Sequence, residues 1–189
     1  EVVCVDVHAG RRTRSQSFGA THVAAPEDLA AAAGEITDRH GIDVVLEFSG
    51  ASQAFETAWP LIRLGGRIVL VGSVFPDVPV PLSLEQIVRR HMTICGIHNY
   101  AARHLLAAVQ FLADHQNRFP FADLVAAWYS LSATPQAFDR ARDRDTIRVG
   151  IRPHESRGTG SGTTLPSQAL HETANCDIVP PSSPDANSP

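Results

Sequence analysis

Short apolar segments alternate with segments of helical periodicity through most of the chain. Residues 2–7, 43–48 and 67–72 are predicted strands, because their apolar side chains follow one another with little polar alternation. The pattern further predicts strands over 19–23, 93–97, 124–131 and 146–152, and helices over 12–18, 26–39, 52–64, 84–91, 103–115 and 135–142. This alternation is typical of a parallel sheet with helices on its faces.

Glycine and proline refine these boundaries. Pro26 and two acidic residues open the helix at 26–39, and Gly41 follows its end. The next helix carries an apolar stripe through Phe55, Ala58, Trp59 and Ile62, and we expect Gly65 and Gly66 to end it. The strand at 67–72 has no polar alternation, so we expect it to be buried on both faces.

The first predicted strand ends in an acidic residue, Asp6. In a Rossmann βαβ unit, an acidic residue at the end of the second strand binds the adenosine ribose, about 20 residues after a glycine-rich phosphate turn. No such turn precedes Asp6 in this sequence. We therefore predict an α/β fold with an incomplete doubly wound (Rossmann) parallel sheet that lacks its first strand.

Composition narrows the function classes. The 189 residues, 43% hydrophobic and 19% charged, suit one globular domain with a substantial core. A net charge of −4 gives no electrostatic reason to expect a nucleic acid or a membrane as partner, and no apolar run approaches the ~20 residues of a membrane span. The three widely spaced cysteines, Cys4, Cys95 and Cys176, suit a cytoplasmic location. We expect Cys95, in an apolar strand, to be a core residue.

The chain changes character twice toward its end. We predict a dinucleotide-binding segment over 1–119, a return segment with its own strands and helix over 120–152, and a disordered tail over 153–189. Half of the residues after Pro153 are Gly, Pro, Ser or Thr, and none is aromatic. Such a segment buries too little apolar surface to offset its ordering entropy. A shifted or fused reading frame is the alternative interpretation of the tail.

The order of several short motifs resembles one known family. Val5-Asp6-Val7, Phe18-Gly19-Ala20-Thr21, Asp43 to Gly50, Gly65 to Gly72, and Ile147-Arg148-Val149 together resemble the cofactor-binding half of medium-chain, zinc-dependent alcohol dehydrogenases, over about residues 1–152. Gly96-Ile97-His98-Asn99-Tyr100 and Gly72-Ser73-Val74-Phe75-Pro76 resemble more narrowly the alcohol dehydrogenases associated with phosphonate catabolism.

The resemblance implies a cofactor site. Asp6 would bind the ribose hydroxyls and repel the extra phosphate of NADP, with Arg11 beside the same ribose. The basic residues Arg11, Arg12 and Arg14 leave NADP open, although NAD is favoured. Each position also has an ordinary structural interpretation, such as a solvated turn acid for Asp6.

The same resemblance assigns the remaining cofactor contacts. It places Phe48, Ser49 and Gly50 at the adenosine side of the cofactor, and backbone groups of Val71, Gly72, Ser73, Ile97 and His98 at the nicotinamide. Arg148 would contact the pyrophosphate, with a surface ion pair as the alternative. His98 is not assigned a catalytic role, since nine histidines occur in the chain.

The resemblance also implies a reaction. The zinc ligands and proton relay of similar proteins lie in an N-terminal catalytic domain, so no catalytic or metal-binding residue is assigned here. We predict a C-terminal portion of an oxidoreductase that transfers hydride from a small-molecule alcohol to NAD, with zinc in the parent enzyme. The chain alone is expected to be inactive and to expose two strand edges where the first strand is missing.

Several alternatives stay open. One is a zinc-independent quinone or enoyl reductase of the same superfamily, and another is a methyltransferase-like Rossmann domain. By resemblance, the parent is expected to form a homo-oligomer through the strand from Thr93 to Ile97.

Overall fold

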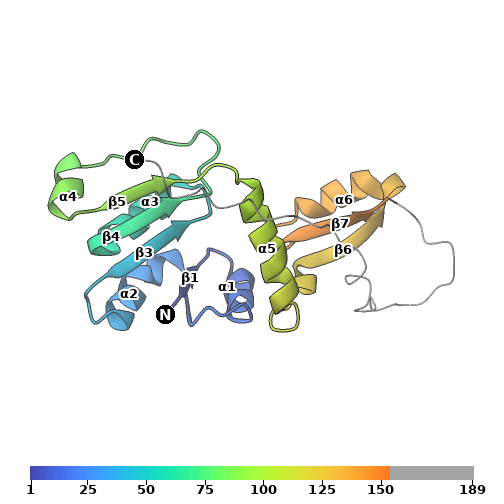
Figure 1. Cartoon of the computed structure of the whole chain (residues 1–189), viewed down its shortest axis with the longest axis horizontal. Helices are drawn as coiled ribbons and strands as arrows, with labels where there is room; N and C mark the ends of the chain where they lie inside the picture. Colours follow the sequence, from blue (N-terminus) through green and yellow to red (C-terminus); the bar gives the residue numbers. More distant parts are fainter. Residues whose placement is uncertain (154–189) are drawn as a thin grey trace, which may run out of the picture. The chain divides into compact units, whose positions relative to one another are not determined.

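A computed structural model of the chain describes residues 1–153. Parallel strands with intervening helices make up its fold, as predicted (Figure 1). The strands form three separate sheets, one of three strands and two of two strands.

The largest sheet has the order β3-β4-β5, from β3 (Ile42–Glu47), β4 (Ile62–Leu70) and β5 (Thr93–Gly96). All its pairings are parallel, and Ile68 lies opposite Val45 on one side and Ile94 on the other. The carboxyl ends of the three strands therefore meet at one edge of the sheet, where open α/β sheets bind ligands.

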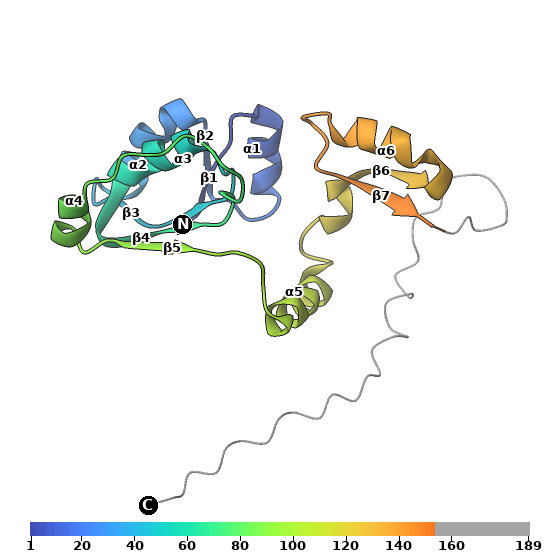
Figure 2. The same ribbon diagram turned by 90° about the horizontal axis from the view of Figure 1, so that it is seen from above.

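One helical layer covers one face of this sheet. Helix α3 (Ser52–Ala58) lies on that side in Figure 2. The 3₁₀ turn η2 (Trp59–Leu61) follows α3, and the short helix α4 (Leu84–Arg89) follows β4. The buried core consists of Phe55, Trp59, Ile62, Ile68 and Met92. Three members of the predicted apolar stripe, Phe55, Trp59 and Ile62, thus belong to this core, and the fourth, Ala58, is also buried.

The opposite face of the sheet is open among the described residues. Leu46, Val69 and Cys95 lie side by side on that face, since they are partners in the strand register. Leu46 and Cys95 are exposed, and Val69 is half-buried. The predictions that strand 67–72 is buried on both faces and that Cys95 is a core residue are therefore wrong, because apolar side chains cover only one face.

The first part of the chain forms its own pair of strands. β1 (Val3–Val5) runs parallel to β2 (His22–Ala24), and α1 (Ala9–Gln16) connects them. The turn η1 (Pro26–Asp28) and helix α2 (Leu29–Ile36) then lead to β3. β1 and β3 each pair with one strand only, so each keeps one unpaired edge within residues 1–153. The predicted division of the sheet is confirmed there.

The last described part forms a second two-stranded sheet. Helix α5 (Ala102–His115) and the turn η3 (Phe121–Leu124) precede β6 (Val125–Ser130). The turn η4 (Leu131–Ala133) and helix α6 (Thr134–Ala141) then lead to β7 (Arg148–Arg152), which is parallel to β6. This agrees with the strand, helix and strand expected after residue 120, whereas the proposed segment limits stay predictions. Residues 154–189, to which the predicted tail belongs, lie outside the described residues.

The double glycine is not where the preceding helix ends. Strand β4 begins at Ile62 and continues through Gly65 and Gly66, so the helix predicted over 52–64 is too long. Ile62 lies opposite Ile42 but Arg67 lies opposite Val44, so β4 carries extra residues in an irregular register. Gly65 has φ +72°, and a Cβ on Gly66 would crowd Ile62. The pair permits a bulge within a strand.

No helix among the described residues is long and apolar enough to cross a membrane.

The burial of the core predicts that alanine substitutions at two positions on β4 change the free energy of unfolding by very different amounts. Ile68→Ala should lower the free energy of unfolding by about 2–5 kcal/mol, because Ile68 is fully buried. Leu64→Ala, on the same strand but 62% exposed, should change it by less than about 0.5 kcal/mol. Urea unfolding of both variants measures the difference, and equal effects would contradict the described core.

Candidate functional site

A buried carboxylate organises the carboxyl end of β3. Glu47 is only 5% exposed, although it is charged and lies in an apolar strand. Its Oε1 accepts hydrogen bonds from the Ser49 N–H (2.6 Å), the Ser49 hydroxyl (2.6 Å) and the Gly50 N–H (2.9 Å). Its Oε2 accepts a longer bond of 3.3 Å from the Ser73 hydroxyl. A carboxylate bound in this way fixes the turn that follows its own strand.

The main chain of Glu47 connects the same turn to the end of β4. Its carbonyl oxygen accepts hydrogen bonds from the N–H groups of Val71 (2.8 Å) and Gly72 (2.9 Å). A Cβ on Gly72 would overlap the backbone of Phe48 and Gly50, and Gly50 itself has φ +76°. The two turns are therefore in direct backbone contact, which only glycine allows at these positions.

The end of β5 lies next to this pair of turns. The Ile97 N–H donates to the Leu70 carbonyl at 2.9 Å, which extends the β4–β5 pairing by one bond. The Ile97 side chain is 50% exposed, and His98 follows it on the surface. The structure thus brings the predicted residues after three strands to one edge of the sheet: Phe48, Ser49, Gly50, Val71, Gly72, Ser73, Ile97 and His98.

Asp6 and Arg11 form a separate group after β1. The Asp6 carboxylate accepts a 2.8 Å hydrogen bond from the His8 N–H, and Arg11 Nη1 lies 3.8 Å from its other oxygen. Arg12 Nη1 donates to the Asp6 carbonyl at 2.7 Å, which closes the loop before α1. Asp6 keeps further acceptor capacity on a partly exposed carboxylate, as recognition of hydroxyl groups requires.

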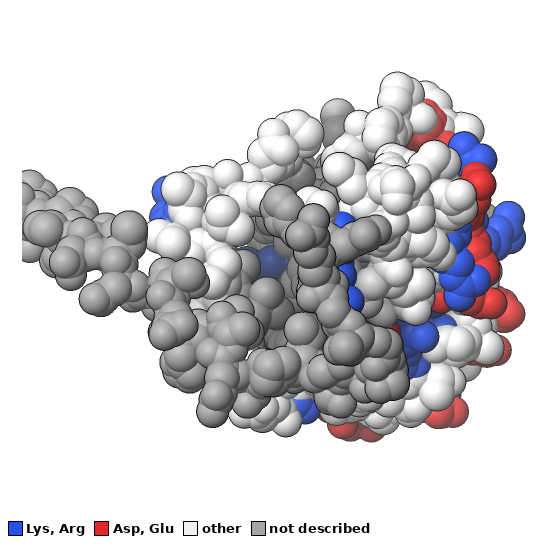
Figure 3. All heavy atoms as spheres, turned by 90° about the vertical axis from the view of Figure 1, so that its right-hand side faces the viewer, with Lys and Arg blue, Asp and Glu red and all other residues white. Residues whose placement is uncertain are grey.

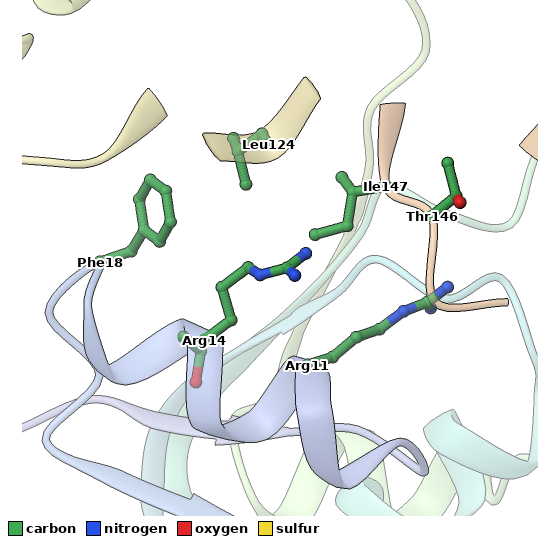
Figure 4. A pocket seen from close by; sticks show the side chains of 7 residues that line it. Arg11, Arg14, Phe18, Leu124, Thr146 and Ile147 are labelled. Atoms are coloured by element: carbon green, nitrogen blue, oxygen red, sulfur yellow. The ribbon is translucent and has the colours of Figure 1, made fainter. Parts of the chain in front are cut away.

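A cavity of about 450 Å³ lies beside Arg11 (Figure 4). Figure 4 shows Arg11 and Arg14 extending from α1 toward the segment that contains Thr146 and Ile147. Arg11 Nη2 also donates to the Arg144 carbonyl at 2.8 Å. The cavity is lined by Arg11, Arg14, Ser15, Phe18, Leu124, Thr146 and Ile147. Within the described residues, buried Arg11 Nε and Thr146 Oγ1 have no hydrogen-bond partner, so the cavity wall has unused polar capacity.

Arg148 stands apart from the other predicted site residues. It is exposed at the first position of β7, opposite Val125. No hydrogen bond or ion pair joins its side chain to Asp6, Gly50 or Gly72 in residues 1–153. Arg148 follows the cavity residues Thr146 and Ile147 in the sequence and belongs to the β6–β7 sheet, not to the sheet that ends at Gly72.

Charges on the described surface are mixed in sign. Figure 3 shows acidic and basic side chains close together along one side of the face in view. On α6 and just after it, Arg140 pairs with Asp143 at 2.7 Å and Arg142 with Asp139 at 3.5 Å. The electrostatic fields of neighbouring charges of opposite sign cancel at a distance, so this part of the surface has no strong attraction for a highly charged partner of either sign.

Glu47 is the residue that sequence reasoning missed. It occurs in the motif from Asp43 to Gly50, where it was interpreted only as part of an apolar strand. A glutamate at the end of such a strand, followed by Phe-Ser-Gly, is the signal that could have found it. A buried acid needs donors, and Ser49 and Gly50, two and three positions further on, supply three.

The described residues contain no group of three or more His, Cys, Asp or Glu side chains that could hold a metal ion. Cys4 is half-buried and Cys95 exposed, and both are free thiols. Residues 1–153 therefore offer no fit to a catalytic zinc, which needs about three protein ligands.

Glycines in the turns after parallel strands, with an acidic residue after β1, are typical of dinucleotide-binding α/β folds. A sequence model described as zinc-binding dehydrogenase matches residues 1–114. The chain belongs to this family, whose members are oxidoreductases that use NAD or NADP. Membership argues against the methyltransferase alternative.

Individual relatives agree with this assignment. The D-arabitol-phosphate dehydrogenase of Enterococcus avium is 32% identical over 125 residues, which are 66% of this chain and 35% of that protein. The sorbitol dehydrogenase of Bacillus subtilis is 29% identical over 157 residues, 81% of this chain and 43% of that protein. The chain thus spans less than half the length of these relatives.

The fold also matches solved structures. An alcohol dehydrogenase of Thermotoga maritima superposes with a TM-score of 0.75 and 23% identity, over 82% of this chain and 43% of that one. The likeness confirms the Rossmann-like α/β fold. The narrower resemblance to phosphonate-associated enzymes stays a prediction.

The contact between the two turns predicts how a methyl group added at Gly72 changes the free energy of unfolding. Gly72→Ala should lower the free energy of unfolding by more than about 1 kcal/mol, because the new Cβ would overlap the backbone of Phe48 and Gly50. Gly96→Ala is the matched control, since a Cβ on Gly96 meets nothing within 4 Å. Denaturant unfolding measures both variants. If Gly72→Ala were as stable as Gly96→Ala, the described contact would be wrong.

Proposed function

We propose that this chain forms the cofactor-binding portion of an NAD-dependent, zinc-dependent alcohol dehydrogenase. The observation that carries the proposal is the sheet edge at which the turns after β3 and β4 touch, with β5 ending beside them. A dinucleotide can approach the backbone closely there because glycines occupy the contact. Family membership supports the same class of reaction.

Asp6 and Arg11 would bind the adenosine ribose. The Asp6 carboxylate would accept hydrogen bonds from the ribose hydroxyls, and its charge would disfavour a 2′-phosphate. Arg11 lies 3.8 Å from that carboxylate and reduces its charge only in part. This balance favours NAD over NADP.

The turns at the sheet edge would hold the other parts of the cofactor. Phe48, Ser49 and Gly50 would lie along the adenosine side. The backbone at Val71, Gly72 and Ser73, together with Ile97 and His98, would orient the nicotinamide so that hydride moves on one face of the ring. Arg148 would reach the pyrophosphate, for which its exposed guanidinium is suited.

The chemistry at the alcohol would depend on residues outside 1–153. Zinc in such enzymes supplies a Lewis acid for the alcohol oxygen. The contribution of residues 1–153 would be to bind and orient the dinucleotide. The unpaired edges of β1 and β3 would be completed by one further parallel strand between them.

The substrate would be a small alcohol or polyol. The relatives named above act, by their names, on D-arabitol phosphate and sorbitol. The outer edge of β5 has no partner strand among the described residues, and pairing of two copies there would make a homo-oligomer.

Metal analysis and activity test the proposal together. The full-length protein that contains this chain should hold stoichiometric zinc and reduce NAD with a member of an alcohol and polyol panel, and chelation should abolish the rate. Residues 1–189 alone should show no activity. Metal-free full-length protein with intact NAD(P)H-linked reduction of a quinone would favour the zinc-independent alternative. The absence of any NAD(P)-linked activity would refute both.

Substitution of Asp6 tests the choice of cofactor. Asp6→Asn should lower the kcat/KM for NAD by about tenfold relative to that for NADP. The substitution removes a charged acceptor for the ribose hydroxyls of NAD and the repulsion of the 2′-phosphate of NADP. Asp28→Asn, at an exposed aspartate with no side-chain cap bond, is the control. An unchanged NAD to NADP ratio in Asp6→Asn would place the ribose elsewhere.

A further inference from the structure

The geometry around Glu47 points to a role beyond the stability of its own strand. We propose that Glu47 is a positioning residue for the nicotinamide end of the cofactor, acting through the turns that it joins. The inference rests on the proposed function, because it needs a dinucleotide at this edge. It assigns a role to a residue that would not itself touch the cofactor.

One oxygen of Glu47 holds the turn after β3 through three hydrogen bonds. Glu47 Oε1 accepts from the Ser49 N–H, the Ser49 hydroxyl and the Gly50 N–H, all between 2.6 and 2.9 Å. The Ser49 oxygen in turn accepts from the Ala51 N–H at 3.2 Å, at the start of α3. Charge-assisted hydrogen bonds of this kind hold the turn in one conformation.

Glu47 also connects this turn to the end of β4. The same carboxylate accepts from the Ser73 hydroxyl, and the Glu47 carbonyl accepts from Val71 and Gly72. Gly72 in turn rests on the backbone of Phe48 and Gly50. A shift of the turn after β3 therefore moves the Gly72–Ser73 backbone, which is the part proposed to face the nicotinamide.

Glu47 does not belong to the cluster of apolar residues that forms the buried core. Among residues 1–153, the buried core consists of other residues, and every hydrogen bond of the Glu47 side chain goes to Ser49, Gly50 or Ser73. The Phe48 side chain is 67% exposed at the same turn, so it does not anchor the turn by apolar burial. The Glu47 carboxylate is thus the polar anchor common to both turns.

Bound NADH supplies a direct readout in the full-length protein, because the fluorescence of the reduced nicotinamide ring reports how firmly it is held. At saturating NADH, Glu47→Ala should show a fluorescence enhancement per bound NADH about twofold lower than the wild-type protein. Loss of the carboxylate would leave the turns after β3 and β4 too mobile to hold the nicotinamide ring firmly. Glu47→Gln keeps one acceptor oxygen for the turn and should recover most of the enhancement.

Glu56→Ala is the matched control, at an exposed glutamate on α3. Thermal unfolding of each variant is measured in parallel. If Glu47→Ala lowers the unfolding temperature or the affinity but leaves the enhancement per bound NADH unchanged, Glu47 has only a structural role and the inference is overturned. If the unchanged protein binds no NADH, the proposed function fails and this inference fails with it.

Discussion

A single buried carboxylate connects the two turns on which the candidate site depends. Glu47 accepts hydrogen bonds from donors after β3 and from Ser73 after β4, while its carbonyl binds Val71 and Gly72. Burying a charge is costly unless donors satisfy it, so the carboxylate and the two turns require one another. Gly50 and Gly72 then allow the backbones to touch. Sheet pairing brings these elements close, and the carboxylate makes the arrangement specific.

A second constraint is that the sheet is not fully covered within residues 1–153. Parallel sheets in α/β proteins are normally buried on both faces. Here the core occupies the face of Ile68, while Leu46 and Cys95 are exposed on the other. β1 and β3 each keep an unpaired edge, and the chain spans less than half the length of its relatives. In the proposed enzyme, residues outside 1–153 would cover this open face and these edges.

The sequence pattern predicted the order of strands and helices because apolar runs and helical stripes are set by local burial. It misplaced the end of the helix at 52–64, since Gly65 and Gly66 suit a bulge within a strand as well as a helix end. It placed Cys95 in the core because an apolar strand does not reveal which face is covered. Asp6 was found from its position after a strand, whereas its proximity to Arg11 and the bonds of Glu47 depend on side-chain geometry.

The most direct test of the account is a crystal structure of the full-length protein with bound NADH. The account predicts one additional parallel strand between β1 and β3, the adenosine ribose at Asp6, and the nicotinamide against the backbone of Gly72 and Ser73. Direct pairing of β1 with β3, or a cofactor bound away from the carboxyl edge of the sheet, would contradict it.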